Sequence, residues 1–243
     1  MRKRASKFKK TPKKHQPKSL KIIHEDRDIV VIDKPSGLLT VGNERQRDKT
    51  VIAFLNDYVR KGVVKSRNRV YTVHRLDRET SGILVFAKSK DAQEYLQDEA
   101  PKFKKTYHAI VHGILDPEEG SIKSYLAENG VHKMFTTKDA RKGKHSETCY
   151  KTVKTSAKYS LVKLTLPTSR KHQIRVHLSD KGHPVAGDKK YNEDEKGIKR
   201  LTLHATSIVI THPFTKKEMT FTSELPSYFE SFVKLPEGKK NAE

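Results

Sequence analysis

The sequence predicts an α+β fold built around a mixed, largely antiparallel sheet with few flanking helices. Short β-type runs dominate its 243 residues, and segments with helical spacing are few. Strands and helices do not alternate regularly, which argues against a parallel, doubly wound sheet. We expect one domain over residues 20–235, between a basic tail at residues 1–19 and a polar C-terminal tail at residues 236–243.

The N-terminal half contains two predicted helices. Between Thr50 and Arg60 the apolar residues recur at helical spacing. A second helix is expected from Asp91 to about Glu99, with Ser89 as its N-cap. Strands are expected at residues 29–32, 70–73, 82–87 and 106–112.

The C-terminal half reads mainly as strands. Residues 121–166 hold several short β-like runs, of which residues 160–166 alternate clearly. Thr168 or Ser169 offers a cap for a helix over Lys171–Asp180, with Gly182 as its stop. Later elements are expected as strands at residues 201–203 and 207–210 and a short helix at residues 227–233.

The chain is strongly basic, with 51 Lys and Arg against 29 Asp and Glu and a formal net charge of +22. Nine of the basic residues and none of the acidic ones fall in residues 1–18, so the remainder is basic too. A surplus of this size attracts a polyanion over long range, and we expect nucleic acid as the partner. The tail itself cannot bury a core, so we expect it to be disordered. It either adds non-specific RNA affinity or has no specific role.

A single cysteine, Cys149, excludes an intramolecular disulfide and a cysteine-based metal cluster. No apolar run approaches the length of a membrane span, and no apolar core follows the basic N-terminus as it would in a secretory signal. We therefore expect a cytoplasmic protein. We also expect it to be a monomer.

The most informative segment is a polar loop at residues 74–82 between two predicted strands. It packs four charged residues and a histidine into six positions. Loops carried by rigid strands often present catalytic groups. A charged loop is still more often a solvated turn than an active site, and composition alone does not decide between the two.

A second informative segment is Ser169–Leu178, which has helical spacing. Ile174 and Leu178 share one face, and Arg175 is placed to point into a cleft. The alternative is an amphipathic helix with a basic exterior. His172 and His177 are five residues apart, a poor spacing for shared metal ligation, so we expect no metal site.

Six segments of the chain occur in an order that matches one family. They are Asp33-Lys34-Pro35-Ser36-Gly37, His74-Arg75-Leu76-Asp77-Arg78-Glu79-Thr80-Ser81-Gly82, Lys105-Thr106-Tyr107 with Val111-His112-Gly113, His172 through Leu178, Gly182 through Asp188, and Leu203-His204-Ala205. Taken in order, these segments resemble the RluA-type pseudouridine synthases over roughly residues 20–230. The family usually has Gly-Arg-Thr before His-Gln-Ile-Arg, and here the chain departs with Ser169-Arg170-Lys171.

The resemblance implies an enzyme that isomerises a uridine of ribosomal or transfer RNA to pseudouridine in a central cleft. The glycosidic bond breaks and the rotated base rejoins the ribose through carbon, so no cofactor is implied. Asp77 matches the essential aspartate, which attacks the sugar or the base or removes a ribose proton. Arg175 matches the basic residue that pairs with this aspartate, and Tyr107 matches the active-site tyrosine.

The same resemblance implies residues that hold the substrate. Ile174 is expected to pack under the base. Arg75 is expected either to fill the gap that the extruded uridine leaves or to contact a phosphate. His74 orients the loop or makes a structural hydrogen bond, and Arg170 is expected to contact the substrate.

Two other classes of function compete with this interpretation. A non-catalytic RNA-binding or ribosome-assembly protein on the same fold would be favoured by loss of Asp77 or Tyr107, and both residues are present. A nuclease would call for a metal carboxylate cluster or paired histidines, and neither is evident. The product distinguishes a synthase from a nuclease: a synthase yields isomerised RNA of unchanged length, and a nuclease yields cleaved RNA.

Overall fold

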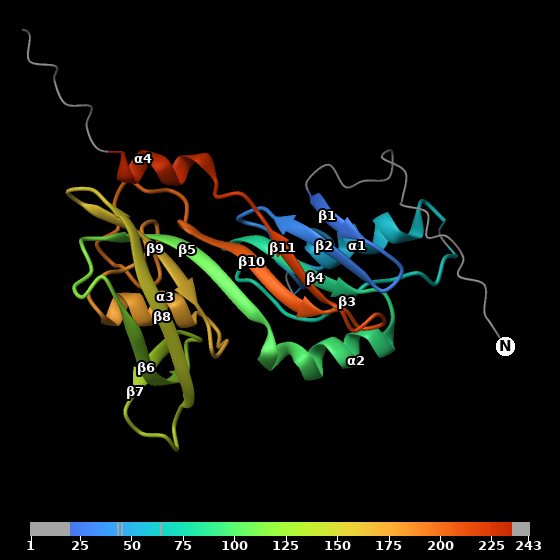
Figure 1. Ribbon diagram of the computed structural model, residues 1–243, viewed down its shortest axis with the longest axis horizontal. Coiled ribbons are helices and arrows are strands. Elements are labelled where there is room, and N and C mark those ends of the chain that lie inside the picture. Colours follow the sequence, from blue (N-terminus) through green and yellow to red (C-terminus); the bar gives the residue numbers. More distant parts are fainter. Residues whose placement is uncertain (1–19, 43, 45, 64, 235–243) are drawn as a thin grey trace, which may run out of the picture. The chain divides into compact units, whose positions relative to one another are not determined.

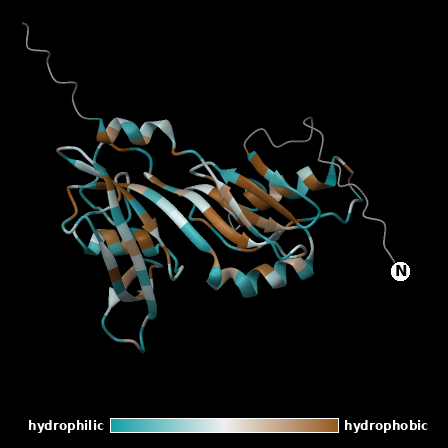
Figure 2. Ribbon diagram, viewed as in Figure 1, coloured by the Kyte–Doolittle hydropathy of each residue, from teal (hydrophilic) through white to brown (hydrophobic). Residues whose placement is uncertain are grey.

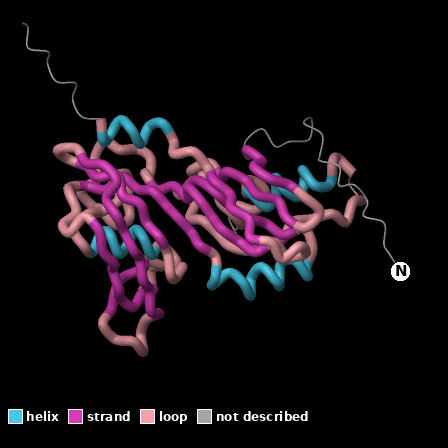
Figure 3. The backbone as a smooth tube through the Cα atoms, viewed as in Figure 1, coloured by secondary structure: helices cyan, strands magenta, loops and turns pink. Residues whose placement is uncertain are grey.

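The computed structural model describes residues 20–42, 44, 46–63 and 65–234, so the predicted tails lie outside the described residues. The chain divides into two compact units that interleave in the sequence. Unit 1 consists of the residues up to Lys105 together with Ala205–Ser223, and unit 2 of Thr106–His204 together with the residues from Glu224 onward. Strands dominate and helices are few in both (Figure 3), which confirms the predicted α+β class. The single domain over residues 20–235 stays a prediction.

Unit 1 is built on antiparallel strand pairs. β1 (Lys21–Glu25) pairs with β2 (Ile29–Lys34), and β2 pairs with β4 (Ser81–Ala87), which also pairs with the short β3 (Tyr71–Thr72). β10 (Leu203–Thr211) and β11 (Glu218–Thr222) form an antiparallel pair. The apolar runs of β2 and β4 (brown in Figure 2) are buried nearly throughout, as expected for strands that are covered on both faces.

Two capped helices flank this sheet, both as predicted. α1 (Val51–Arg60) begins after Thr50, whose hydroxyl accepts a hydrogen bond from the N–H of Ala53. α2 (Lys90–Glu99) begins after Ser89, which accepts from the N–H of Ala92. The buried side chains of α2 pack into the core of unit 1, and a 3₁₀ turn, η2 (Ala100–Lys102), leads from α2 into β5 (Lys104–His112; Figure 1).

The strands of unit 2 pair antiparallel in the order β5, β9, β8, β6, β7. Its core joins Ile110 of β5 and Leu161 of β9 to Phe229 and Val233 near the C-terminal end of the described chain. The bounds of its elements are β6 (Glu119–Glu128), β7 (Met134–Thr137), β8 (Lys144–Thr155), β9 (Tyr159–Thr165), α3 (Gln173–Asp180), η3 (Ser227–Phe229) and α4 (Glu230–Val233).

Two predicted boundaries were wrong. α3 begins at Gln173, not Lys171, because His172 adopts a left-handed conformation (φ 54°) and is itself the N-cap. The Thr168 hydroxyl donates to the side-chain oxygen Oε1 of Gln173 (2.9 Å) and accepts from the N–H of Glu147 (2.8 Å), so it does not cap a backbone N–H of the helix. The strands predicted at residues 201–203 and 207–210 are one continuous strand, β10, which begins at Leu203 and so leaves out Leu201 and Thr202. None of the helices in the described part of the chain has the length and apolarity needed to cross a bilayer.

Candidate active site

The predicted loop at residues 74–82 lies in unit 1, and its last two residues, Ser81 and Gly82, belong to β4. Its backbone is fixed at the residue before Asp77. Leu76 is buried, and the Thr40 hydroxyl donates to its carbonyl (2.9 Å) and accepts from its N–H (3.4 Å). The Asp77 side chain that follows is half-buried. The loop therefore holds the position of Asp77 while leaving its carboxylate partly accessible.

Lys34, at the end of β2, is the most buried charge beside this loop, with 0% of its surface exposed. Its ammonium donates to the carbonyls of Pro35 (2.9 Å), Leu38 (2.9 Å) and Arg78 (3.0 Å). Burial lowers the pKa of Lys34 to about 8, while the carboxylates of Glu79 and Asp77 act in the opposite direction. Lys34 belongs to a motif of the resemblance, but no role was predicted for it.

The turn that follows Lys34 continues this attachment. The N–H of Gly37 donates to the carbonyl of Arg78 (2.8 Å), and Arg78 Nε donates back to the carbonyl of Gly37 (3.1 Å). Ser36 Oγ donates to the carbonyl of Glu79 (2.6 Å). Gly37 has φ 89°, in the left-handed region that favours glycine. Residues 34–40 thus form a bracket that holds the loop on both sides of Asp77.

His74 makes a structural hydrogen bond, one of the two roles expected for it. Its Nε2 accepts from the N–H of Val85 (3.2 Å), so this nitrogen carries no proton. Burial, with a further contribution from the charge of Lys105, lowers the pKa of His74 to about 3. His74 is therefore a neutral imidazole at physiological pH that ties the loop to β4.

In unit 2, Arg175 of α3 forms a buried, bidentate ion pair with Asp188. Nε lies 2.7 Å from Oδ2 and Nη2 lies 2.8 Å from Oδ1, and both side chains are at most 5% exposed. The guanidinium also lies over the ring of Tyr191, 5.2 Å from its centroid. This geometry fixes the plane of the guanidinium. Asp188 ends a motif of the resemblance, but its role was missed.

The alternative of a basic exterior for this helix was wrong, because all of residues 173–178 are buried. His177 lies between two hydroxyl groups, with Nδ1 2.9 Å from Thr148 Oγ1 and Nε2 2.8 Å from Ser124 Oγ. Burial lowers its pKa to about 4, although the charge of Asp180 acts in the other direction. α3 is therefore a core helix with polar side chains that are individually satisfied.

The remaining predicted site residues differ in exposure. Tyr107 on β5 and Ile174 on α3 are buried, at 7% and 4% exposure. Arg75 is exposed at the surface of the loop, where an RNA can reach it. Arg170 is exposed too, and its Nε donates a long hydrogen bond to the carbonyl of His145 (3.4 Å). The predicted pairing of Arg175 with Asp77 stays a prediction.

Comparison with known proteins decides which reaction such a loop serves. The family described as RNA pseudouridylate synthase matches residues 28–180. The chain belongs to this family. It is 34% identical over 227 residues both to the ribosomal large subunit pseudouridine synthase C of Buchnera aphidicola (87% of this chain and 69% of that one) and to the tRNA pseudouridine synthase C of Yersinia pestis (84% and 86%). The solved structure of human RNA pseudouridylate synthase domain containing 4 aligns with a TM-score of 0.72 and 26% identity, over 86% of this chain and 90% of that one.

This pseudouridine synthase is therefore an isomerase that converts uridine in RNA to pseudouridine. It is also 36% identical over 211 residues to the dual-specificity RNA pseudouridine synthase RluA of Haemophilus influenzae (84% of this chain and 93% of that one), which confirms the resemblance to the RluA type. The reaction makes and breaks bonds within one nucleotide.

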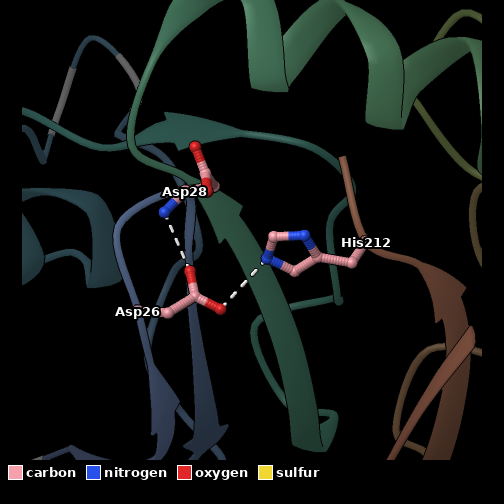
Figure 4. A group of neighbouring side chains, drawn as sticks. All are labelled: Asp26, Asp28 and His212. Carbon is pink, nitrogen blue, oxygen red and sulfur yellow. Dashed lines mark hydrogen bonds and ion pairs between the residues drawn. The ribbon is translucent and has the colours of Figure 1, made fainter. Parts of the chain in front are cut away.

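One group in the described part of the synthase has metal-ligand spacing: Asp26, Asp28 and His212 of unit 1 (Figure 4). His212 Nδ1 accepts from the N–H groups of Phe214 (3.2 Å) and Thr215 (3.0 Å), so its proton is on Nε2. That Nε2–H donates to Asp26 Oδ2 (3.1 Å), while Asp26 Oδ1 accepts from the N–H groups of Asp28 and Ile29. These hydrogen bonds use the ring nitrogens of His212 and the carboxylate oxygens of Asp26, so this pair ties two turns together.

Proposed function

We propose that this synthase modifies a specific uridine of ribosomal or transfer RNA, with Asp77 as its essential carboxylate. One relative is named for ribosomal RNA and another for transfer RNA, which supports both target classes. The observation that carries the role of Asp77 is the attachment of its loop by Thr40 and Lys34, with the carboxylate left half-buried. A nucleophile or base needs such fixed backbone geometry together with access to substrate.

Asp77 must be ionised in every route open to it, whether it attacks the sugar, attacks the base or removes a ribose proton. Closing RNA over it removes water and raises the cost of that charge. We propose that Arg175 provides the compensating charge. Its pair with Asp188 uses Nε and Nη2, and a guanidinium also carries N–H groups on Nη1, so one arginine suits two carboxylates at once.

Tyr107 and Ile174 complete the proposed site for the base. Both side chains are buried and largely apolar, which suits stacking on and packing under a uracil that has left the helix. The Tyr107 hydroxyl is the proposed group for proton transfer late in the reaction. Tyrosine suits this role because it combines a flat ring with a weak acid.

Arg75 is the proposed contact to the RNA from which the uridine is extruded. It is exposed in the loop, two residues before Asp77. A planar guanidinium stacks where a base has left and also bonds phosphate, so both roles stay open. Arg170, exposed before α3, is the second proposed RNA contact. We propose that the enzyme acts as a cytoplasmic monomer without a cofactor.

The test of Asp77 is the substitution Asp77→Asn, which keeps the shape of the side chain and removes its charge. We expect no detectable pseudouridine from the purified variant, with the melting temperature and RNA affinity of the wild type. The substrate comes from mapping pseudouridines in the ribosomal and transfer RNA of cells with and without the gene.

Glu79→Gln is the matched control, because Glu79 is an exposed carboxylate two residues away in the same loop. It should keep most of the activity. Substantial turnover by Asp77→Asn would remove Asp77 from the chemistry. If cells that lack the gene show the same pseudouridines as cells that have it, the non-catalytic RNA-binding alternative would be favoured instead.

A further inference from the structure

Lys105, the second residue of β5, is a buried lysine to which the proposed function assigns no role. Only 9% of its surface is exposed. No hydrogen bond or ion pair within the described part of the chain engages its ammonium, which lies 5.7 Å from the centroid of the Phe103 ring. Burial lowers the pKa of Lys105, and no described carboxylate acts against this effect.

A buried ammonium without a counter-charge is costly, since no carboxylate compensates for the hydration that burial removes. The comparison with Lys34 makes the point, because Lys34 is still more buried but donates to three carbonyls. The side-chain atoms that are sealed from solvent without a partner, among the described residues, are Arg60 Nε, Thr152 Oγ1 and Glu195 Oε1. The Lys105 ammonium is not among them, so its tip is open to an incoming group.

Lys105 lies next to the catalytic loop. The ring of Phe103, which its ammonium faces, packs edge-on against His74, with the centroids 6.5 Å apart. The charge of Lys105 acts on His74 directly. Along β5, Lys105 and Tyr107 are two residues apart and therefore share a face, and both are buried while their neighbours Lys104 and Thr106 are not.

We propose that Lys105 binds a phosphodiester oxygen of the RNA at or beside the target nucleotide. The partner must be anionic because the ammonium lacks a counter-charge, and the phosphodiester is the anionic group of an RNA. This inference rests on the proposed function, since it takes Asp77 and Tyr107 as the residues that receive the uridine. Lys105 would then hold the backbone of that nucleotide, not its base.

The first test is Lys105→Met, which keeps the length of the side chain and removes its charge. RNA binding is measured in the Asp77→Asn background, so that it does not depend on turnover. We expect RNA to bind about tenfold more weakly and the slope of log affinity against log salt to fall by about one. The melting temperature should stay the same or rise, because a desolvated charge is gone.

Lys104→Met is the matched control. Lys104 is the neighbouring residue on β5, is 75% exposed, and lies 3.7 Å from Glu218 Oε2. We expect this control to change the affinity and the slope by much less. If Lys105→Met binds RNA with wild-type affinity and slope, or loses no more than Lys104→Met, the proposal is overturned.

A second measurement identifies the phosphate on the RNA that Lys105 binds. Neutral methylphosphonates are placed one at a time at the phosphates that flank the target uridine in a synthetic stem-loop. The intact protein should lose about tenfold in affinity at one of these positions, and Lys105→Met should show no further loss there. Equal losses at that phosphate for both proteins would mean that another residue binds it. Failure of Asp77→Asn to abolish turnover would contradict the proposed function and leave these binding results unaffected.

Discussion

At the scale of single residues, Arg175 has a structural role in its buried pair with Asp188 and a proposed role in the reaction, and two substitutions distinguish them. Arg175→Ala leaves the Asp188 carboxylate buried without its partner, which should cost about 3–5 kcal/mol of the free energy of unfolding. Arg175→Lys keeps the charge but cannot reproduce the two parallel hydrogen bonds. If Arg175 also compensates Asp77, we expect Arg175→Lys to lower kcat about tenfold or more, since one such charge-assisted hydrogen bond is worth that much.

Asp188→Asn is the control for the part of the loss in kcat that comes from weakening the pair of Arg175 with Asp188. It weakens the same pair from the other side, so urea unfolding should show it to be destabilised as well. Its kcat, measured below the unfolding transition, should fall less than that of Arg175→Lys. Wild-type rates for Arg175→Lys would place Arg175 outside the chemistry and leave it as a packing residue.

The lowered pKa of His74 predicts how the stability of the protein depends on pH. Its pKa is about 3 in the folded protein, against an ordinary value of 6.5. Between these values the unfolded chain binds a proton that the folded protein cannot, so stability is present above pH 6.5 and is lost as the pH falls towards 3. At pH 5 this loss should be on the order of 1–2 kcal/mol.

His74→Gln removes the titration but keeps an oxygen that can accept from the N–H of Val85. Urea unfolding at pH 7 and at pH 5 should show a smaller loss for this variant than for the wild type. The pKa of His177 is also lowered, but His177 is present in both proteins, so its contribution to the pH dependence cancels in the comparison. The same pH dependence in both proteins would show that His74 is protonated in the folded state.

At the scale of elements, the bracket formed by residues 34–40 holds a loop that lies about forty residues further along the chain. Lys34→Met leaves the carbonyls of Pro35, Leu38 and Arg78 without their common donor. We expect a loss of about 2–4 kcal/mol in the free energy of unfolding. We also expect a lower kcat, because the backbone before and after Asp77 becomes less fixed.

Lys21→Met provides the comparison for this variant. Lys21 is exposed at the start of β1, so its replacement should leave both stability and activity near the wild-type values. If Lys34→Met unfolds at the wild-type urea concentration with an unchanged kcat, the bracket does not support the loop.

Local signals predicted the elements whose ends are set by neighbouring residues. α2 was predicted because Ser89 caps it through a hydrogen bond to a residue three positions on. α3 was predicted with the wrong start, since its first turn depends on the left-handed His172 and on Gln173 Nε2 bonding the carbonyl of Glu147 on a distant strand. Contacts between residues so far apart leave no periodic pattern in a single sequence.

The same distinction applies to the site. The predicted loop carries its own signal, a cluster of charge between apolar strands, and it lies between strands in the structure. Lys34 and Asp188 lie outside it, and their roles follow from partners 44 and 13 residues away, Arg78 and Arg175. Their presence in the motifs of the resemblance was the one available signal, and it marked their positions without giving their contacts.

At the scale of the whole molecule, the net charge of +22 suits binding to RNA, which is a polyanion. Lysines and arginines that contact phosphate raise affinity without reading sequence, so most of this charge should act on binding and not on the choice of uridine. We therefore expect the enzyme's selectivity to come from the shape of the RNA and from the residues around the target uridine.

The nine Lys and Arg of residues 1–18 offer the sharpest test of this division. Deleting these residues should weaken RNA binding mainly at low salt, because their contribution comes from releasing counterions. The plot of log affinity against log salt should become shallower by roughly 0.7–0.9 for each phosphate that the shortened protein no longer neutralises. The pseudouridine map should not change. A full-length variant with the nine residues replaced by glutamine controls for length and should match the deletion. An unchanged slope would show that residues 1–18 neutralise no phosphate, and a different modified uridine would show that they take part in reading the RNA.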